Sequence, residues 1–218
     1  MKLHRTIFGI FLLWSLNGLT QGFLNLDFES AKIVADNSQG NPFVFATNAI
    51  PHWVAYIGGS PLTDIAYNSI ALDEPAVSIH GTNSAYVTPI QGNFSVYLQA
   101  GSQFAHGTNS AIGQTGQIPL SALSLLFWGS VANVQITFAG QTLVYAVISS
   151  TANYNIYGAD ISAFAGQTGQ LLFTASRPGG AILDNIQFST SSVPEPGVLS
   201  LLGLAGLGFL LAKKRQRR

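Results

Sequence analysis

Asp184 is the acidic residue whose position in the sequence most clearly suggests a chemical role. It is separated from Ile182, Ile186 and Phe188 by even numbers of residues, so in an extended strand it would point to the same side as these apolar side chains. A carboxylate buried in this way is costly unless a partner compensates its charge. Hydrogen bonds from backbone amides, or contact with Arg177, are partners that the chain could supply.

The histidines of the central chain do not fall into a recognisable catalytic pattern. His52, His80 and His106 lie beside proline or glycine, which predicts loops. The chain contains neither a Gly-x-Ser-x-Gly elbow nor a His-Glu-x-x-His motif. A hydrolase needs a nucleophile with a base in reach, or two carboxylates across a cleft. We therefore expect no catalytic residues, and a secreted polysaccharide hydrolase is the alternative.

Aromatic side chains in or near the expected loops are candidates for ligand contact, because an exposed ring can stack on a sugar ring. These candidates are Trp53, Tyr56, Tyr67 and Tyr157. The alternative is that they belong to the core, since aromatic side chains dominate cores by area. For Trp53, and for Trp128 further along the chain, that alternative is at least as strong.

The last 26 residues have three parts that together predict a C-terminal transmembrane helix. The first part is Val193, Pro194, Glu195 and Pro196. Its prolines favour an extended shape and hold the glutamate on an exposed segment. The second part, residues 197–212, is uncharged and would be about 24 Å long as a helix, somewhat short for a bilayer core of about 30 Å. The third part carries cations that favour the cytoplasmic side of a membrane: Lys213, Lys214, Arg215, Arg217 and Arg218.

In this order, and at the end of the chain, the three parts resemble the PEP-CTERM sorting signal. That signal belongs to Gram-negative bacteria that make extracellular polysaccharide, and the same tail is also known as an ice-binding-protein C-terminal motif. The resemblance implies recognition by an exosortase, a membrane transpeptidase, with cleavage near the motif. The precursor would be anchored in the inner membrane before the protein reaches the cell surface or the medium. An ordinary tail anchor is the alternative.

The first 22 residues have the layout of a secretory signal peptide. Lys2 and Arg5 precede an uncharged apolar segment at residues 6–16, and small or polar residues follow as far as Gly22. Residues 23–192 then remain as one domain, followed by the sorting signal at 193–218. The domain has two cations against eight carboxylates, a net charge of −6, which argues against nucleic acid as a partner. Because the chain has no cysteine, its core must stabilise it without disulfides.

The central domain has the pattern of many short strands separated by turns. Leu24, Leu26 and Phe28 alternate with polar residues and predict a first strand. Residues 31–61 have no clear period. Nine further strands are expected at residues 77–79, 85–88, 94–99, 124–128, 134–138, 142–149, 153–157, 170–175 and 181–189, with turns such as 58–59 and 140–141 between them. This pattern predicts an all-β, antiparallel β-sandwich of the jelly-roll type.

Three short polar sequences occur twice. His-Gly-Thr-Asn-Ser-Ala spans 80–85 and 106–111, Gly-Gln-Thr-Gly-Gln spans 113–117 and 166–170, and Ala-Gly-Gln-Thr spans 139–142 and 165–168. Their unequal spacing excludes a solenoid. Repeated turn chemistry is the simpler explanation. The alternative is a row of polar loops at one rim of the sandwich, where such folds bind ligands.

The order of three segments, 25–29, 89–98 and 183–188, resembles the galactose-binding-like jelly roll of many carbohydrate-binding modules. The resemblance implies two sheets with adjacent first and last strands. It also implies a structural Ca²⁺ between those strands, held by acids at the positions of Glu29 and Asp184. Backbone carbonyls would have to complete the six or more oxygen ligands that Ca²⁺ prefers. The long insert at residues 31–63 departs from the family and leaves the binding face open.

These observations predict an exported, non-catalytic β-sandwich protein of the extracellular matrix, structural or carbohydrate-binding. Its expected partners are an exosortase, the membrane before processing, and a polysaccharide. A secreted hydrolase and an ice-binding adhesin are the alternative classes, although the sequence has no strict Thr-x-Thr ladder.

Overall fold

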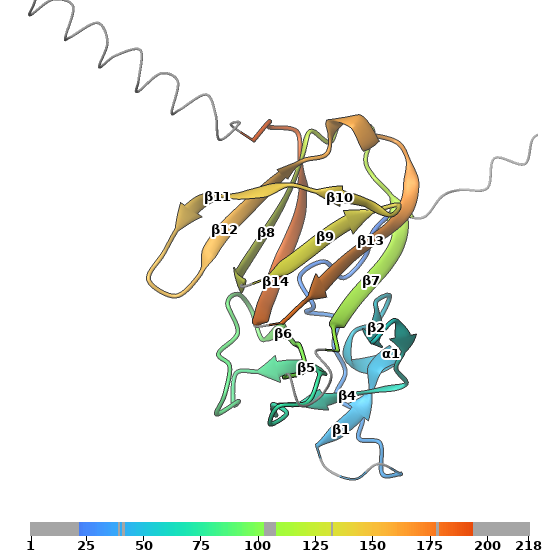
Figure 1. The fold of residues 1–218 in the computed structure, drawn as a ribbon, viewed down its shortest axis with the longest axis vertical. Helices are drawn as coiled ribbons and strands as arrows, with labels where there is room; N and C mark the ends of the chain where they lie inside the picture. The colour runs from blue at the N-terminus through green and yellow to red at the C-terminus, as the bar shows by residue number, and fades with distance from the viewer. Residues whose placement is uncertain are drawn as a thin grey trace, which may run out of the picture.

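The fold consists of two β-sheets that form a sandwich (Figure 1). The computed structural model describes residues 22–38, 40, 42–102, 108–131, 133–177 and 179–193. In this part of the chain, the larger sheet contains, in spatial order, β1 (Phe43–Phe45), β4 (Asp64–Tyr67), β5 (Ala76–Gly81), β6 (Phe94–Gln99), β14 (Gly180–Ser189), β8 (Ser124–Val131), β12 (Asn155–Asp160) and β11 (Tyr145–Ser150). The smaller sheet contains β10 (Gln141–Leu143), β9 (Val134–Phe138), β13 (Thr168–Ala175), β7 (Ser110–Gln117), β2 (Val54–Ile57) and β3 (Ser60–Pro61).

The strand pairs of the described residues are antiparallel, except that β4 and β5 run parallel. The helical elements are short: α1 (Ala46–Ala49) and a 3₁₀ turn, η1 (Ser162–Phe164). The all-β sandwich predicted from the sequence is therefore confirmed.

Alternating burial explains why several strands fall where the sequence predicts them. In β9, Val134, Ile136 and Phe138 are buried, whereas Gln135 is exposed and Thr137 half-buried. This two-residue period is the one expected for a strand with one face on the core. Strands β6 and β9 have the predicted bounds, and β5, β8, β12, β13 and β14 overlap the predicted segments.

The core lies between the two sheets and is rich in aromatic side chains. Phe127 on β8 and Phe173 on β13 are fully buried, with ring centroids 5.5 Å apart, so the two sheets meet through these rings. Tyr157 on β12 stacks on Phe127 at 5.0 Å. Full burial of such a side chain contributes about 1.5–3 kcal/mol. The packed rings hold the sheets together and leave their outer faces available for other contacts.

The opening segment is not a strand, which corrects the prediction made from the alternation of Leu24, Leu26 and Phe28. Asn25 and Phe28 have φ angles of 50° and 60°, in the left-handed region rather than in the extended region of a regular strand. The backbone of this segment is hydrogen-bonded by the side chain of Gln114 rather than by a neighbouring strand. Its amide donates to the Leu24 carbonyl at 2.8 Å and accepts from the Leu24 amide at 2.6 Å.

The predicted proximity of the two ends of the domain is confirmed. The amide of Ile186 on β14 donates to the carbonyl of Leu26 at 2.9 Å. The rings of Phe23 and Phe188 have centroids 5.2 Å apart. The opening segment thus packs beside the closing strand without belonging to a sheet.

Several elements differ from the sequence-based expectation. Residues 31–61 contain β1, α1, β2 and β3 rather than an irregular stretch, and residues 85–88 form no strand. The expected strand 142–149 is divided at Val144 into β10 and β11, which belong to different sheets. Strand β7 was missed because its sequence, Ser-Ala-Ile-Gly-Gln-Thr-Gly-Gln, has the composition of a turn.

The Gly-Gln-Thr-Gly-Gln repeats do not form matching loops, which corrects the interpretation as repeated turn chemistry. The first copy lies within β7, and the second copy begins in a turn and continues into β13. The two strands pair, with Gly116 opposite Gly169 and Thr115 opposite Gln170. The repeats therefore meet in the smaller sheet.

In the described residues, no helix is long and apolar enough to cross a membrane. The predicted signal peptide, apart from Gly22, and the predicted C-terminal helix lie outside these residues.

Candidate functional site

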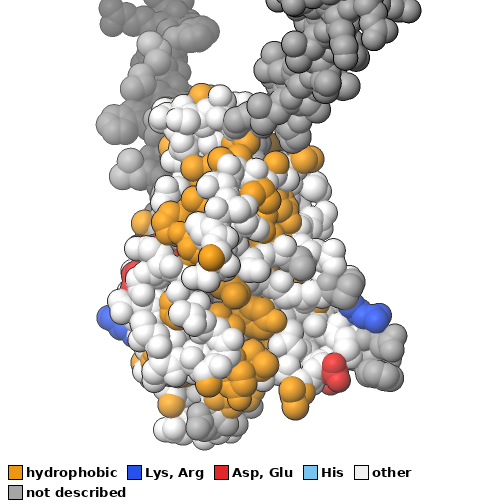
Figure 2. Space-filling view, turned by 90° about the vertical axis from the view of Figure 1, so that its left-hand side faces the viewer, with side chains coloured by type: hydrophobic (Ala, Val, Ile, Leu, Met, Phe, Trp, Pro, Cys, Tyr) orange, Lys and Arg blue, Asp and Glu red, His pale blue; other side chains and the backbone are white. Residues whose placement is uncertain are grey.

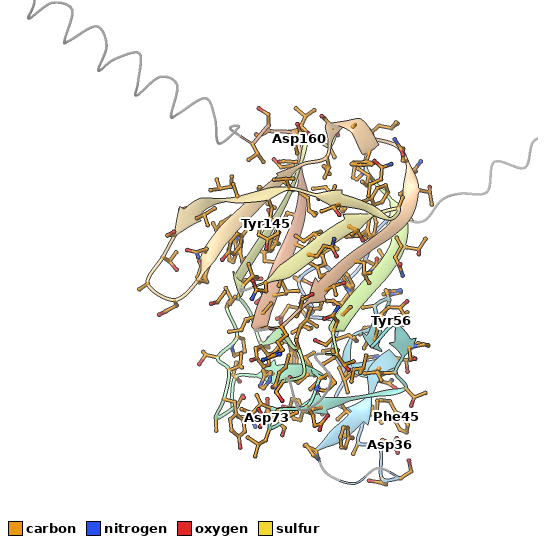
Figure 3. The ribbon with its side chains drawn as sticks, viewed as in Figure 1. Asp36, Phe45, Tyr56, Asp73, Tyr145 and Asp160 are labelled. Atoms are coloured by element: carbon orange, nitrogen blue, oxygen red, sulfur yellow. The ribbon has the colours of Figure 1, made fainter. Side chains whose placement is uncertain are left out.

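A groove of about 560 Å³ lies on the outer face of the smaller sheet, over β2, β7 and β13. The strand register aligns Tyr56 with Ala111, and Ala111 with Thr174. Figure 3 labels Tyr56 on β2. The residues that line the groove are uncharged: Tyr56, Gly58, Gly59, Thr108, Asn109, Ala111, Gln170, Leu172 and Thr174.

Gly113 allows two side chains of β13 to lie across β7. A Cβ atom at this position would be 2.9 Å from Leu172 Cδ1 and 3.1 Å from Gln170 Nε2, closer than such contacts normally allow. With glycine there, Gln170 reaches the next strand and its Nε2 donates to Tyr56 Oη at 3.2 Å. This hydrogen bond orients both the amide and the phenol.

The rim of the groove is formed by the turn between β2 and β3. Gly58 and Gly59 have φ angles of 57° and 83°, which favour glycine. The Gly58 amide donates to the Asn109 carbonyl at 2.9 Å, so the turn is tied to the segment before β7. The sequence-based prediction of a turn here is confirmed.

The chemistry of the groove suits a neutral polar ligand. Side-chain amides and hydroxyls can exchange hydrogen bonds with a ligand, and the phenol adds an aromatic ring. An ion that entered the groove would lose water without gaining an opposite charge from these residues. Hydroxyl-rich molecules are therefore the best match.

The aromatic candidates from the sequence separate into different environments. Trp53 is 3% exposed and donates from its indole Nε1 to the Asn25 carbonyl at 2.9 Å, and Tyr157 is 6% exposed. Both belong to the core, so their prediction as ligand-stacking rings is wrong. Burial of their apolar area stabilises the fold, which is why they lie inside the domain. Tyr56 lines the groove. Tyr67 on β4 is half-buried, outside the groove, with its hydroxyl 3.4 Å from Asn83 Oδ1.

The sequence did not point to Gln170, which lines the groove, or to Gly113, which lies against the Gln170 side chain. Both belong to the Gly-Gln-Thr-Gly-Gln repeats, so the repeat was the signal that could have identified them. The two copies come together only because β7 pairs with β13, and residue types alone do not predict that pairing.

Glu29 and Asp184 both bind the loop that precedes β6. Glu29 Oε1 accepts from the backbone amides of Asn93 and Phe94, at 2.8 and 2.9 Å. Asp184 Oδ2 accepts from the Gln91 amide at 2.9 Å and from Ser95 Oγ at 2.6 Å. Two carboxylates far apart in sequence thus accept hydrogen bonds from four residues between Gln91 and Ser95, at the end of the loop and the start of β6.

The contacts of these carboxylates favour the hydrogen-bond alternative over a calcium site. Their oxygens accept from N–H and O–H groups, whereas Ca²⁺ requires a shell of oxygen ligands. In the part of the chain that the structure describes, no three side chains of His, Cys, Asp or Glu are grouped as a metal site would require. The observed contacts therefore support the hydrogen-bond alternative, and the Ca²⁺ site at Glu29 and Asp184 stays a prediction.

Asp184 is fully buried, as predicted, but on the side of β14 away from the core. Ala181 and Leu183 point into the core, so Asp184 lies on the opposite face beneath the loop before β6. A register shift between Asp184 and Gln187 then returns Ile186 to the core. Burial is the main reason that the pKa of Asp184 rises to about 6, while the hydrogen bond from Ser95 opposes the rise.

His80 is fully buried at the end of β5, between two serines. Its Nε2 lies 2.9 Å from Ser78 Oγ and its Nδ1 lies 2.8 Å from Ser84 Oγ. Burial lowers the pKa of His80 to about 4, so the imidazole is neutral at pH 7. Ser78 is also fully buried, which prevents this Ser–His pair from meeting a substrate in the structure.

Comparison with known families identifies the end of the chain. Residues 192–218 match the PEP-CTERM protein-sorting motif. The chain carries a PEP-CTERM sorting signal. The prediction for Val193, Pro194, Glu195, Pro196 and the basic tail is confirmed as a motif, although residues 194–218 lie outside the described part. The PEP-CTERM signal implies export, recognition by an exosortase and membrane-anchored sorting toward the cell surface.

No curated protein matches the sequence. Among solved structures, the enzymatically active domain of tailspike protein 4 from bacteriophage CBA120 matches with a TM-score of 0.38 and 15% identity. The match covers 64% of this chain and 19% of that one. A similarity of this size carries no conclusion about the function of this chain.

Proposed function

We propose that this PEP-CTERM protein is a non-catalytic β-sandwich that binds neutral polysaccharide at the cell surface. The groove on the smaller sheet carries the proposal, because it joins a tyrosine, an anchored glutamine amide, an asparagine and two threonines without a charged group. Sugar hydroxyls need hydrogen-bond partners, and sugar ring faces pack on aromatic rings. The sorting signal supports this setting, since it resembles the signal of bacteria that make extracellular polysaccharide.

The proposal also covers the targeting segments and the finer fold. Residues 1–22 act as a signal peptide, and residues 197–212 act as a membrane helix that is removed when an exosortase cleaves near Pro-Glu-Pro. The two-sheet architecture and the closeness of Leu26 to β14 support a galactose-binding-like jelly roll.

A non-catalytic role is preferred to the hydrolase alternative because the Ser78–His80 pair is buried and a substrate cannot reach it. Ser78 and His80 are both fully buried, and neither lines the groove. A nucleophile must reach the substrate carbonyl or anomeric carbon, which these positions do not permit.

A glycan array with the purified domain, residues 23–192, tests the proposed function. We expect binding to one or more neutral polysaccharides without release of reducing ends. Release of reducing ends would favour the hydrolase instead. Selective binding to anionic glycans would contradict the match between the uncharged groove and a neutral ligand.

A further inference from the structure

The outer face of the larger sheet carries an apolar surface beside the point where the chain leaves the domain. We call this surface the exit patch and define it by Leu126, Trp128, Ile148, Tyr154, Ile156 and Val193. Leu125 and Phe127 are fully buried in the core, so their neighbours Leu126 and Trp128 on β8 point outward.

Strand pairing and ring contacts make the exit patch continuous. Trp128 lies opposite Ile156 on the neighbouring strand β12. The Trp128 ring stacks on Tyr154, in the turn between β11 and β12, with centroids 5.4 Å apart. Ile148, on the adjacent strand β11, is 42% exposed. Apolar side chains therefore extend over three adjacent strands.

Val193 is packed on this patch immediately before the sorting motif. A Cβ atom on Gly158 would lie 2.9 Å from both Val193 Cγ2 and Ile148 Cγ1, so the glycine provides the space that these side chains occupy. Two residues earlier, the Ser191 carbonyl accepts from Ser124 Oγ at 2.7 Å. The chain thus leaves the domain along the patch.

The distance from Val193 to the expected membrane segment is short. The uncharged run begins at Gly197, and four fully extended residues span at most about 14 Å. The headgroup layer on one side of a bilayer is itself roughly 5–8 Å thick. If residues 197–212 are in the membrane, the exit patch must stay close to the lipid surface.

The composition of the patch suits that position. Residues 145–159, which are the β11–β12 hairpin up to its last residue, Asp160, contain no charge. Figure 2 shows the side of the molecule with this hairpin, where hydrophobic and uncharged side chains predominate. Tryptophan and tyrosine are enriched where proteins meet the membrane–water boundary. Asp160, at the end of β12, is exposed and lies at the same end of the sheet as Ser189, where the chain leaves the domain (Figure 3).

We propose that the exit patch rests on the outer lipid surface of the membrane while the precursor is anchored, and is released by cleavage. This inference rests on the proposed temporary membrane helix. It explains why apolar side chains surround the exit point of a chain that is later displayed in water.

Because the chain has no cysteine, single cysteines can report on this contact. The full-length Ile148→Cys protein, labelled with an environment-sensitive fluorophore, would be reconstituted in vesicles of phosphatidylethanolamine and phosphatidylglycerol. The control is Leu72→Cys, which is 86% exposed and adjacent to Asp73, at the other end of the molecule (Figure 3). We expect blue-shifted emission and several-fold weaker iodide quenching at position 148 than at position 72.

Equal iodide quenching at the two positions in vesicles that carry the protein would overturn the inference. Protection that disappears when the protein is diluted with lipid would indicate contact between copies instead, and protection that requires added exosortase would indicate docking on the enzyme. Vesicle flotation separates the two proposals: a chain that does not float contradicts the membrane helix, whereas a floating chain with an accessible Ile148 label contradicts only the lipid contact.

Discussion

At the scale of single residues, the shape of the groove depends on the absence of a side chain at Gly113. Gly113 has no side chain, so Gln170 can cross β7 and donate to Tyr56. The backbone of Gly113 is that of an ordinary strand, so alanine can be accommodated there without left-handed strain. The role of this glycine is therefore separable from folding.

Gly113→Ala should weaken polysaccharide binding several-fold with little loss of stability. The new methyl group would displace the ends of Leu172 and Gln170 and break a hydrogen bond worth about 1 kcal/mol. Binding would be measured by titration calorimetry and folding by urea denaturation. Thr115→Ala, an exposed change on the same strand, is the control and should bind like the parent protein. Unchanged affinity in Gly113→Ala would show that this arrangement is unimportant.

Asp184 should make the free energy of unfolding fall as pH rises from about 4 to about 6. Its pKa is about 6 in the folded chain, against 3.8 ordinarily, so the folded state holds a proton that the unfolded state releases. His80, whose folded pKa is about 4, acts in the opposite direction: its contribution is full above about 6.5 and is lost as pH falls toward about 4.

The difference in free energy of unfolding between Asp184→Asn and the parent protein should therefore shift in favour of the variant as pH rises from 4 to 7, by up to about 3 kcal/mol for a shift of about two pKa units. Urea denaturation of both proteins across this range gives the difference, which cancels the contribution of His80. A difference that does not vary with pH would contradict the burial of an ionisable carboxyl at this position.

At the scale of elements, the loop before β6 is held by side chains from both ends of the domain. Glu29 comes from the opening turn and Asp184 from the closing strand. Each carboxylate accepts backbone amides, and a hydrogen bond to a charged group contributes about 1.5–3 kcal/mol. The loop thus links the two ends of the chain to the larger sheet.

Glu29→Ala should lower the free energy of unfolding by about 2 kcal/mol, because the amides of Asn93 and Phe94 lose their acceptor. Urea denaturation measures the change, and Glu74→Ala, at an exposed position, is the control.

EDTA should leave the melting temperature of the parent protein unchanged, since the carboxylates of Glu29 and Asp184 are satisfied by hydrogen bonds rather than by Ca²⁺. A lower melting temperature in EDTA would support the calcium hypothesis.

At the scale of the whole molecule, the sequence predicted what depends on local pattern. The all-β sandwich, β6, β9 and the sorting motif follow from alternation or from an ordered set of residue types. The prediction of an opening strand was wrong, because the alternation of apolar and polar residues does not predict the left-handed backbone at Asn25 and Phe28. The groove was missed, apart from Tyr56, because it arises only when β7 pairs with β2 and β13.

Glu195→Ala should leave export intact and block maturation. The glutamate supplies the one charge of the Pro-Glu-Pro segment that an exosortase can recognise. Intact-mass analysis should show the full-length form accumulating in the inner membrane, as it should for the unmodified protein in a host without its exosortase. An identical mass through Arg218 with and without the exosortase would show that the tail is a plain anchor.

Titration calorimetry with the neutral polysaccharide selected on the array tests directly whether the groove is the binding site, by comparing the parent domain with Tyr56→Ala and Tyr67→Ala. Both tyrosines are half-buried on strands, but only Tyr56 lines the groove. We predict that Tyr56→Ala weakens binding about tenfold or more, which corresponds to about 1.4 kcal/mol, and that Tyr67→Ala binds like the parent protein. Equal affinity in all three proteins, or a loss only in Tyr67→Ala, would contradict the assignment of the groove as the binding site.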